Sequence, residues 1–206
     1  RRIPLAYDEM PEQLINAFIA AEDARYFVHP GVDWRGILRA AVNLAMTGER
    51  SQGGSTITMQ LARNVFLSSE RTYTRKIREI LLAIQIENEL SKEEILELYL
   101  NKIFLGERAY GVAAAAQTYF NKSLSELAPH EAATLAAMPQ APSRSVVRDK
   151  ERITERRNYV LREMWQNGYL TEAANTVGAQ LVGAQRPSVT SAPGASDCTP
   201  IDRRPI

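Results

Sequence analysis

Two adjacent acids, Glu22 and Asp23, end an apolar stretch near the start of the chain. The apolar residues before them recur at helical spacing: Leu14, Ile15, Phe18 and Ile19. A helix that starts near Pro11 would bring Glu22 out of an apolar face, where burial raises the pKa of a carboxyl group. Such a group beside a second acid can act as a general base or acid. Solvated acids at a helix end are the alternative interpretation.

A turn is predicted directly after the two acids. The run His29-Pro30-Gly31 favours chain reversal, and Asp33 fits the N-cap of a further helix. The acids would then lie at the rim of a helix–loop–helix. A histidine beside Pro-Gly is more typical of a hydrogen-bonded turn than of a catalytic residue, so His29 adds little by itself.

A second polar group surrounds a glycine-containing loop. Gly53-Gly54 would let the backbone approach a ligand closely, and Ser55 is the expected N-cap of a helix over about 56–67. The exposed amides at a helix start favour an anionic group. Four side chains on this helix are three or four residues apart and project together: Thr56, Gln60, Arg63 and Asn64. A well-capped helix with a polar face explains the pattern equally well.

Arg75 and Lys76 precede Glu79 by four and three residues in an expected helix over about 69–90. Both cations can therefore reach the carboxylate. One planar guanidinium beside one compact ammonium group also suits a pyrophosphate. A solvated charged face is the usual explanation for such a trio.

Further helices must position these groups, and no strand–helix alternation or internal repeat is present, so the predicted fold is mainly α. The expected helices run from Trp34 to Met46, from Ser91 to Gly106 with Asn101 near its end, from Ala109 to Phe120, from Pro129 to before Pro139, and from about Arg148 to Gln166. The first has an apolar stripe that fits either a core helix or an interfacial helix.

Composition limits the possible functions. The 206 residues are 45% hydrophobic and 24% charged, enough for one sizeable core and an appendage. A net charge of +1 gives no general attraction to nucleic acid. A single cysteine, Cys198, rules out an internal disulfide and, with only two histidines, disfavours a zinc site. The sequence shows no signal-peptide pattern and no apolar run long enough to span a membrane.

Taken in order, the motifs resemble the peptidoglycan glycosyltransferase domain of class A penicillin-binding proteins, glycosyltransferase family fifty-one. The resemblance covers about Leu5 to Leu170. It rests on five blocks: Glu22-Asp23 with His29; Gly53-Gly54-Ser55-Thr56 with Gln60 and Asn64; Arg75-Lys76 with Glu79; Tyr99-Leu100-Asn101 with Gly106; and Arg156-Arg157-Asn158 with Val160-Leu161 and Met164.

The resemblance implies a lysozyme-like helical domain of two lobes over residues 1–170. Residues 171–206 are then a linker or the start of a following domain, such as a truncated transpeptidase. The implied activity is polymerisation of lipid II into β-1,4-linked glycan strands at the outer, periplasmic face of the cytoplasmic membrane. The implied partners are the growing lipid-linked glycan chain and the membrane surface, with no nucleic acid. An N-terminal anchor helix, absent from this chain, would hold the enzyme there.

In this family resemblance Glu22 is the catalytic base, and Glu79 is a second catalytic residue that orients two cations or helps hold a divalent metal, Mg or Mn, near the phosphates. No organic cofactor is implied. The substrate-binding residues carried over are Asp23, Tyr26, His29, Ser55, Thr56, Gln60, Arg63, Asn64, Arg75, Lys76 and Asn101.

Three positions depart from the commoner family pattern, namely Tyr26, Met59 and Arg63. Tyr26 keeps an aromatic side chain, whereas Arg63 stands where many members have lysine, so the positive charge is kept but its geometry changes. Two other functions stay open: a lytic glycosidase of lysozyme type acting on finished peptidoglycan, and an inert helical module that recruits partners at the membrane. Neither explains the Arg75, Lys76 and Glu79 block.

Overall fold

The computed structural model describes residues 4–48, 54–67, 72–140 and 150–171, so the expected linker after residue 171 lies outside the described residues. No strand occurs in the described ranges, where an isolated antiparallel bridge joins Phe104 and Tyr110. The prediction of a mainly α fold is therefore confirmed. The helices are η1 (Tyr7–Glu9), α1 (Glu12–Glu22), α2 (Trp34–Thr47), α3 (Ile57–Phe66), α4 (Tyr73–Glu89), α5 (Lys92–Lys102), α6 (Val112–Phe120), η2 (Leu124–Glu126), α7 (Pro129–Ala137), η3 (Met138–Gln140) and α8 (Lys150–Gln166).

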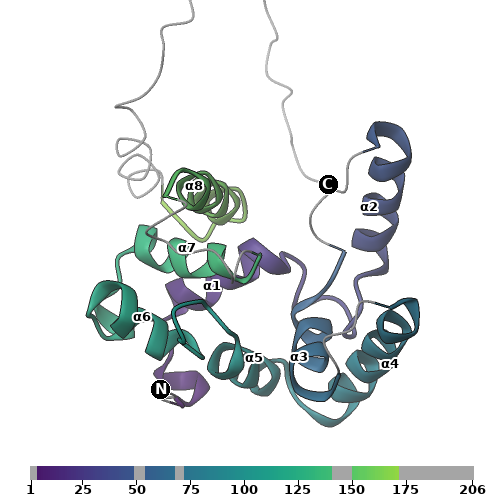
Figure 1. Ribbon diagram of the computed structural model, residues 1–206, viewed down its shortest axis with the longest axis horizontal. Helices are drawn as coiled ribbons and strands as arrows, with labels where there is room; N and C mark the ends of the chain where they lie inside the picture. Colours follow the sequence, from purple (N-terminus) through teal and green to yellow (C-terminus); the bar gives the residue numbers. More distant parts are fainter. Residues whose placement is uncertain (1–3, 49–53, 68–71, 141–149, 172–206) are drawn as a thin grey trace, which may run out of the picture.

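The helices form a larger and a smaller group around separate cores. Figure 1 shows α1, α6, α7 and α8 together on one side and α2, α3 and α4 on the other, with α5 between them. The larger core includes Leu14 and Phe18 of α1, and both are fully buried. The smaller core consists of Val32, Met59 and Ala83. None of the described helices is long and apolar enough to cross a bilayer.

Helix α3 belongs to both cores and so connects the two groups. Ile57 and Leu61 pack into the larger core, whereas Met59 packs into the smaller one. A helix whose apolar residues point to opposite sides must be buried on both. The residue before it, Thr56, is the N-cap, and its hydroxyl accepts from the Met59 amide at 3.2 Å. The prediction of Ser55 as N-cap was therefore wrong by one residue.

The remaining boundaries follow the expected signals with small shifts. Ser91 and Glu94 form the predicted capping box at the start of α5, and α7 begins at Pro129 as predicted. α5 ends at Lys102, before Gly106, because Ile103 is extended and leads into the bridge at Phe104. Gly106, which was predicted to end this helix, therefore lies in the turn that follows it.

Gly31 lets the loop after α1 lie directly against α4. Its φ is +82°, and a Cβ atom there would lie 2.8 Å from the Ala83 carbonyl oxygen. We expect Gly31→Ala to lower the free energy of unfolding by more than about 1 kcal/mol, because alanine is strained at positive φ. Gly168→Ala is the control in urea denaturation, since Gly168 has φ +78° but open space around it. Equal losses for the two variants would show that the contact with α4 contributes nothing.

Candidate active site

Glu22 is the last residue of α1 and lies at the boundary between the two groups of helices. Its Oε2 accepts a hydrogen bond from Nε2 of Gln60 at 2.8 Å. Gln60 is buried on α3, and its Oε1 accepts from the Tyr99 hydroxyl of α5 at 3.2 Å. Three helices that are distant in sequence therefore fix one half-buried carboxylate.

Asp23 is turned into the protein and joins the end of α1 to the start of α3. Both of its carboxylate oxygens lie 2.9 Å from Nε2 of His29, and Oδ2 also accepts from the Ile57 amide at 3.1 Å. Asp23 and His29 are both buried. A carboxylate at a helix N-terminus satisfies an amide that would otherwise lack a partner. We therefore assign these two predicted substrate-binding residues to the scaffold that positions Glu22.

Tyr26 fixes the intervening loop against α5. Its buried hydroxyl donates to the Lys92 carbonyl oxygen at 2.7 Å, and the Lys92 ammonium lies 4.4 Å from the centre of its ring. Burial raises the pKa of Tyr26, and the nearby Glu87 adds to this effect, so the hydroxyl stays protonated. Thr56 completes the attachment by donating to the Gly31 carbonyl oxygen at 2.6 Å. The hydroxyls of Tyr26 and Thr56 thus bond to the backbone, and we assign both residues to holding this loop in place.

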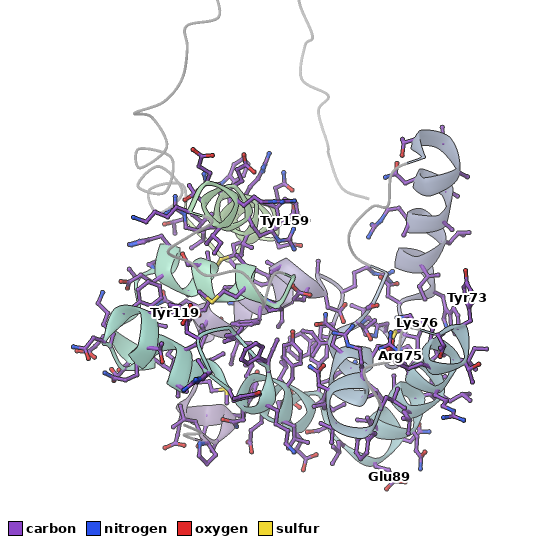
Figure 2. All side chains as sticks on the ribbon, viewed as in Figure 1. Tyr73, Arg75, Lys76, Glu89, Tyr119 and Tyr159 are labelled. Atoms are coloured by element: carbon purple, nitrogen blue, oxygen red, sulfur yellow. The ribbon has the colours of Figure 1, made fainter. Side chains whose placement is uncertain are left out.

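The predicted ion pairs on α4 form a compact cationic cluster with Ser55. Arg75 bonds one oxygen of Glu79 at 2.8 Å, and Lys76 bonds the other at 2.9 Å. Lys76 also donates to the Ser55 hydroxyl at 2.7 Å. The Glu79 carboxylate is buried, whereas the Lys76 and Arg75 side chains are 40% and 17% exposed, so Lys76 is the more accessible of the two cations. Figure 2 shows both cations on the inner side of α4, below α2.

The other predicted site residues lie in three different environments. Arg63 is half-buried on α3, and its charge acts on the Tyr99 hydroxyl, which places it near Glu22. Asn64 is exposed. Asn101 forms two hydrogen bonds with the backbone of Leu5, at 3.0 and 2.7 Å. Because these bonds occupy both ends of its amide, we assign Asn101 to fixing the N-terminal segment.

The set of predicted site residues omitted Tyr99. The hydroxyl of a buried tyrosine normally has a hydrogen-bond partner. Tyr99 lies on the apolar stripe of an amphipathic helix, so its sequence position already indicated burial. That signal shows that a polar group must lie opposite the hydroxyl, although it does not identify Gln60.

Glu79 does not offer the ligands that a resident divalent cation needs. Both of its oxygens already bond cations. No cluster of three or more His, Cys, Asp or Glu side chains suited to a metal ion occurs in the described part of the chain. Mg²⁺ is commonly held by one or two carboxylates together with substrate phosphates. The described residues therefore do not fit a metal held by protein ligands near Glu79.

The site thus combines one partly buried carboxylate with a pair of cations on another helix. The carboxylate can accept a proton, and the cations can stabilise negative charge on a substrate or leaving group. This combination fits a group-transfer enzyme.

Comparison with known proteins agrees with that class. A family model described as Transglycosylase matches residues 1–165. The chain therefore belongs to the transglycosylase family, and it is a glycosyltransferase domain of peptidoglycan synthesis.

Individual relatives match most of this chain but only part of their own length. Penicillin-binding protein 1A of Escherichia coli is 54% identical over 173 residues, which are 84% of this chain and 20% of that protein. The protein of the same name from Vibrio cholerae is 55% identical over 174 residues, or 84% and 21%. The chain thus spans about a fifth of the length of these relatives. The crystal structure of penicillin-binding protein 1A from Haemophilus influenzae is similar with a TM-score of 0.49 and 31% identity, covering 86% of this chain and 17% of that one.

Proposed function

We propose that this domain polymerises lipid II into β-1,4-linked glycan strands, with Glu22 as the general base. The observation that carries the proposal is the separation of roles in the site. Glu22 is half-buried and accepts a hydrogen bond from the Gln60 amide, while the buried Glu79 holds the two cations Arg75 and Lys76 in a cluster of its own. A partly buried carboxylate suits proton transfer, and paired cations suit a pyrophosphate.

In the proposed reaction, Glu22 removes the proton from the 4-hydroxyl of the acceptor N-acetylglucosamine. The acceptor oxygen attacks the anomeric carbon of the donor N-acetylmuramic acid, and the bond from that carbon to the lipid pyrophosphate breaks. The pyrophosphate leaves with the electron pair, and attack on the opposite face converts the α-linked donor into a β-1,4 bond. Arg75 and Lys76 stabilise the charge that develops on the leaving group.

We propose a divalent cation, Mg or Mn, only as a companion of the substrate pyrophosphate. The cationic cluster would then neutralise the remaining phosphate charge. Lysine and arginine are both common phosphate-binding residues, arginine as a planar fork and lysine as a point charge.

The test is direct incubation of the 206-residue chain with lipid II and Mg²⁺, followed by separation of products on a gel. Polymer of increasing length supports the proposal. A lysozyme-type glycosidase would instead release muropeptides from finished cell wall without consuming lipid II, and that outcome would contradict it.

We also propose that the domain works at the outer face of the cytoplasmic membrane, held by an N-terminal helix and joined to a transpeptidase in the complete protein. Its substrate carries a lipid, so the site must lie close to the bilayer.

Helix α2 supports contact with the membrane. Figure 1 shows it extending away from the other helices. Its exposed large apolar side chains are spaced four residues apart along one face: Trp34, Leu38, Val42 and Met46. Ile37, in contrast, packs against the smaller core. The predicted apolar stripe is therefore mostly unburied in the fold, as in helices that lie in a membrane interface.

Replacing Leu38 and Met46 with serine should weaken binding to vesicles of phosphatidylethanolamine and phosphatidylglycerol at least tenfold. The two side chains are 66% and 81% exposed, so their burial in lipid would contribute about 1.5–3 kcal/mol each. Co-sedimentation with the vesicles measures this effect. The control is Trp165→Ser, which removes an exposed apolar side chain from α8. Unchanged binding of the double variant with an intact fold would exclude α2 as a membrane contact.

A further inference from the structure

The Tyr99 hydroxyl is the innermost member of the hydrogen-bond chain that reaches Glu22. Tyr99 is completely enclosed, and its ring packs edge-on against Phe18 at a centroid distance of 6.3 Å. The hydroxyl donates to Oε1 of Gln60 at 3.2 Å. Burial raises the pKa of Tyr99 well above its usual value, and the charge of Glu22 adds to this effect. The hydroxyl therefore keeps its proton and remains a hydrogen-bond donor.

The Gln60 amide connects the Tyr99 hydroxyl to the Glu22 carboxylate. A primary amide has one accepting oxygen and one donating nitrogen, so fixing the oxygen also fixes the nitrogen. With its oxygen held by Tyr99, Gln60 directs Nε2 at Oε2 of Glu22, 2.8 Å away. A reversed amide would bring two accepting oxygens together whenever Glu22 is ionised.

We propose that Tyr99 is a positioning residue for the catalytic base: through Gln60 it holds the ionised Glu22 carboxylate in the orientation that receives the proton of the acceptor hydroxyl. This inference rests on the proposed role of Glu22. It also gives Gln60, predicted as a substrate-binding residue, a contact with the base itself.

Other charged groups near the base stay the same when only the Tyr99 hydroxyl is removed. The charges of Asp23 and Arg63 act on Tyr99 from the end of α1 and from α3. Arg156 of α8 donates to the carbonyl of the residue before Glu22 at 3.1 Å. A change in the pH profile between the wild type and Tyr99→Phe thus reports on the hydroxyl.

The test compares Tyr99→Phe with Tyr119→Phe in lipid II polymerisation by the 206-residue chain. Tyr119 is the matched control because its hydroxyl donates to the Leu105 carbonyl oxygen at 2.8 Å, far from α4 and the cationic cluster in Figure 2. Tyr99→Phe should lower kcat roughly fivefold to tenfold with KM unchanged, the effect of one lost hydrogen bond. Tyr119→Phe should leave kcat and KM at wild-type values.

The pH profile provides a readout that a merely structural role would not change. Donation from Gln60 favours the ionised form of Glu22. Removing the Tyr99 hydroxyl should therefore move the acid limb of the kcat–pH profile to higher pH by about 0.5–1 unit. In a Gln60→Ala background, Tyr99→Phe should have no further effect on either quantity, because the connecting amide is absent.

The outcomes separate this inference from the proposed function. If Tyr99→Phe matches Tyr119→Phe in kcat and in the acid limb, while Glu22→Gln is inactive, the positioning role is overturned and the base assignment stands. If Glu22→Gln is active, the proposed function itself fails. If circular dichroism shows that Tyr99→Phe is unfolded, NMR of the wild type decides: the Gln60 side-chain amide must titrate with the acid limb, and an unresponsive amide overturns the inference.

Discussion

Glu22→Gln is expected to reduce the rate of lipid II polymerisation by roughly 10²–10⁴-fold, the usual contribution of general base catalysis. The amide has the shape of the carboxylate but cannot take the acceptor proton. Its oxygen can still accept the bond that Gln60 donates in the wild type, so the local structure should be retained. Affinity for lipid II should therefore stay within a few-fold of the wild-type value.

A matched control for this variant lies on the same helix. Glu12 is exposed in the first turn of α1, so Glu12→Gln makes the same chemical change away from the site. Polymerisation is followed on gels, and affinity is measured with a non-reacting lipid pyrophosphate. A Glu22→Gln enzyme that polymerises at a rate close to that of Glu12→Gln would show that another group is the base.

Arg75→Ala should lower rate and donor affinity together, unlike Glu22→Gln. The side chain makes a charge-assisted contact with the proposed pyrophosphate, and such contacts contribute about 1.5–3 kcal/mol. The variant also removes one of the two cations bonded to the buried Glu79 carboxylate. Because Lys76 still bonds the other oxygen, the loss of folding free energy should stay below about 3 kcal/mol.

Arg78→Ala is the control for Arg75→Ala because it removes the same charge from an exposed position on α4. Initial rates, inhibition by a lipid pyrophosphate and thermal denaturation would be compared for the two variants. If both lose affinity to the same extent, the effect is a general one of net charge, and Arg75 does not contact the donor phosphates.

Local spacing predicted the contacts that lie within one helix or one turn. The offsets of four and three residues indicated that Arg75 and Lys76 reach Glu79, and both ion pairs are present. The Ser91 and Glu94 signature likewise predicted a capping box that forms. Such contacts depend only on helix geometry, so residue types and spacing are sufficient to predict them.

Contacts between distant segments could not be predicted in the same way. Tyr99 is 39 residues from Gln60, and Asn101 is 96 residues from Leu5. Periodicity indicates which face of a helix is buried but does not identify the opposing atom. The family resemblance, which compares the order of motifs along the chain, grouped Asn101 with the substrate-binding residues. The two hydrogen bonds of Asn101 to Leu5 depend instead on how the N-terminal segment folds back.

The two carboxylates at the end of α1 differ in what they connect, and this has a consequence for local unfolding. Asp23 bonds the Ile57 amide in the first turn of α3, a position where helix ends ordinarily fray. Opening that turn must also break a buried charged hydrogen bond, so the helices that carry Glu22 and Gln60 should open as one cooperative unit. The base and the amide that orients it are then lost together or kept together, and partially opened molecules with a misaligned base are rare.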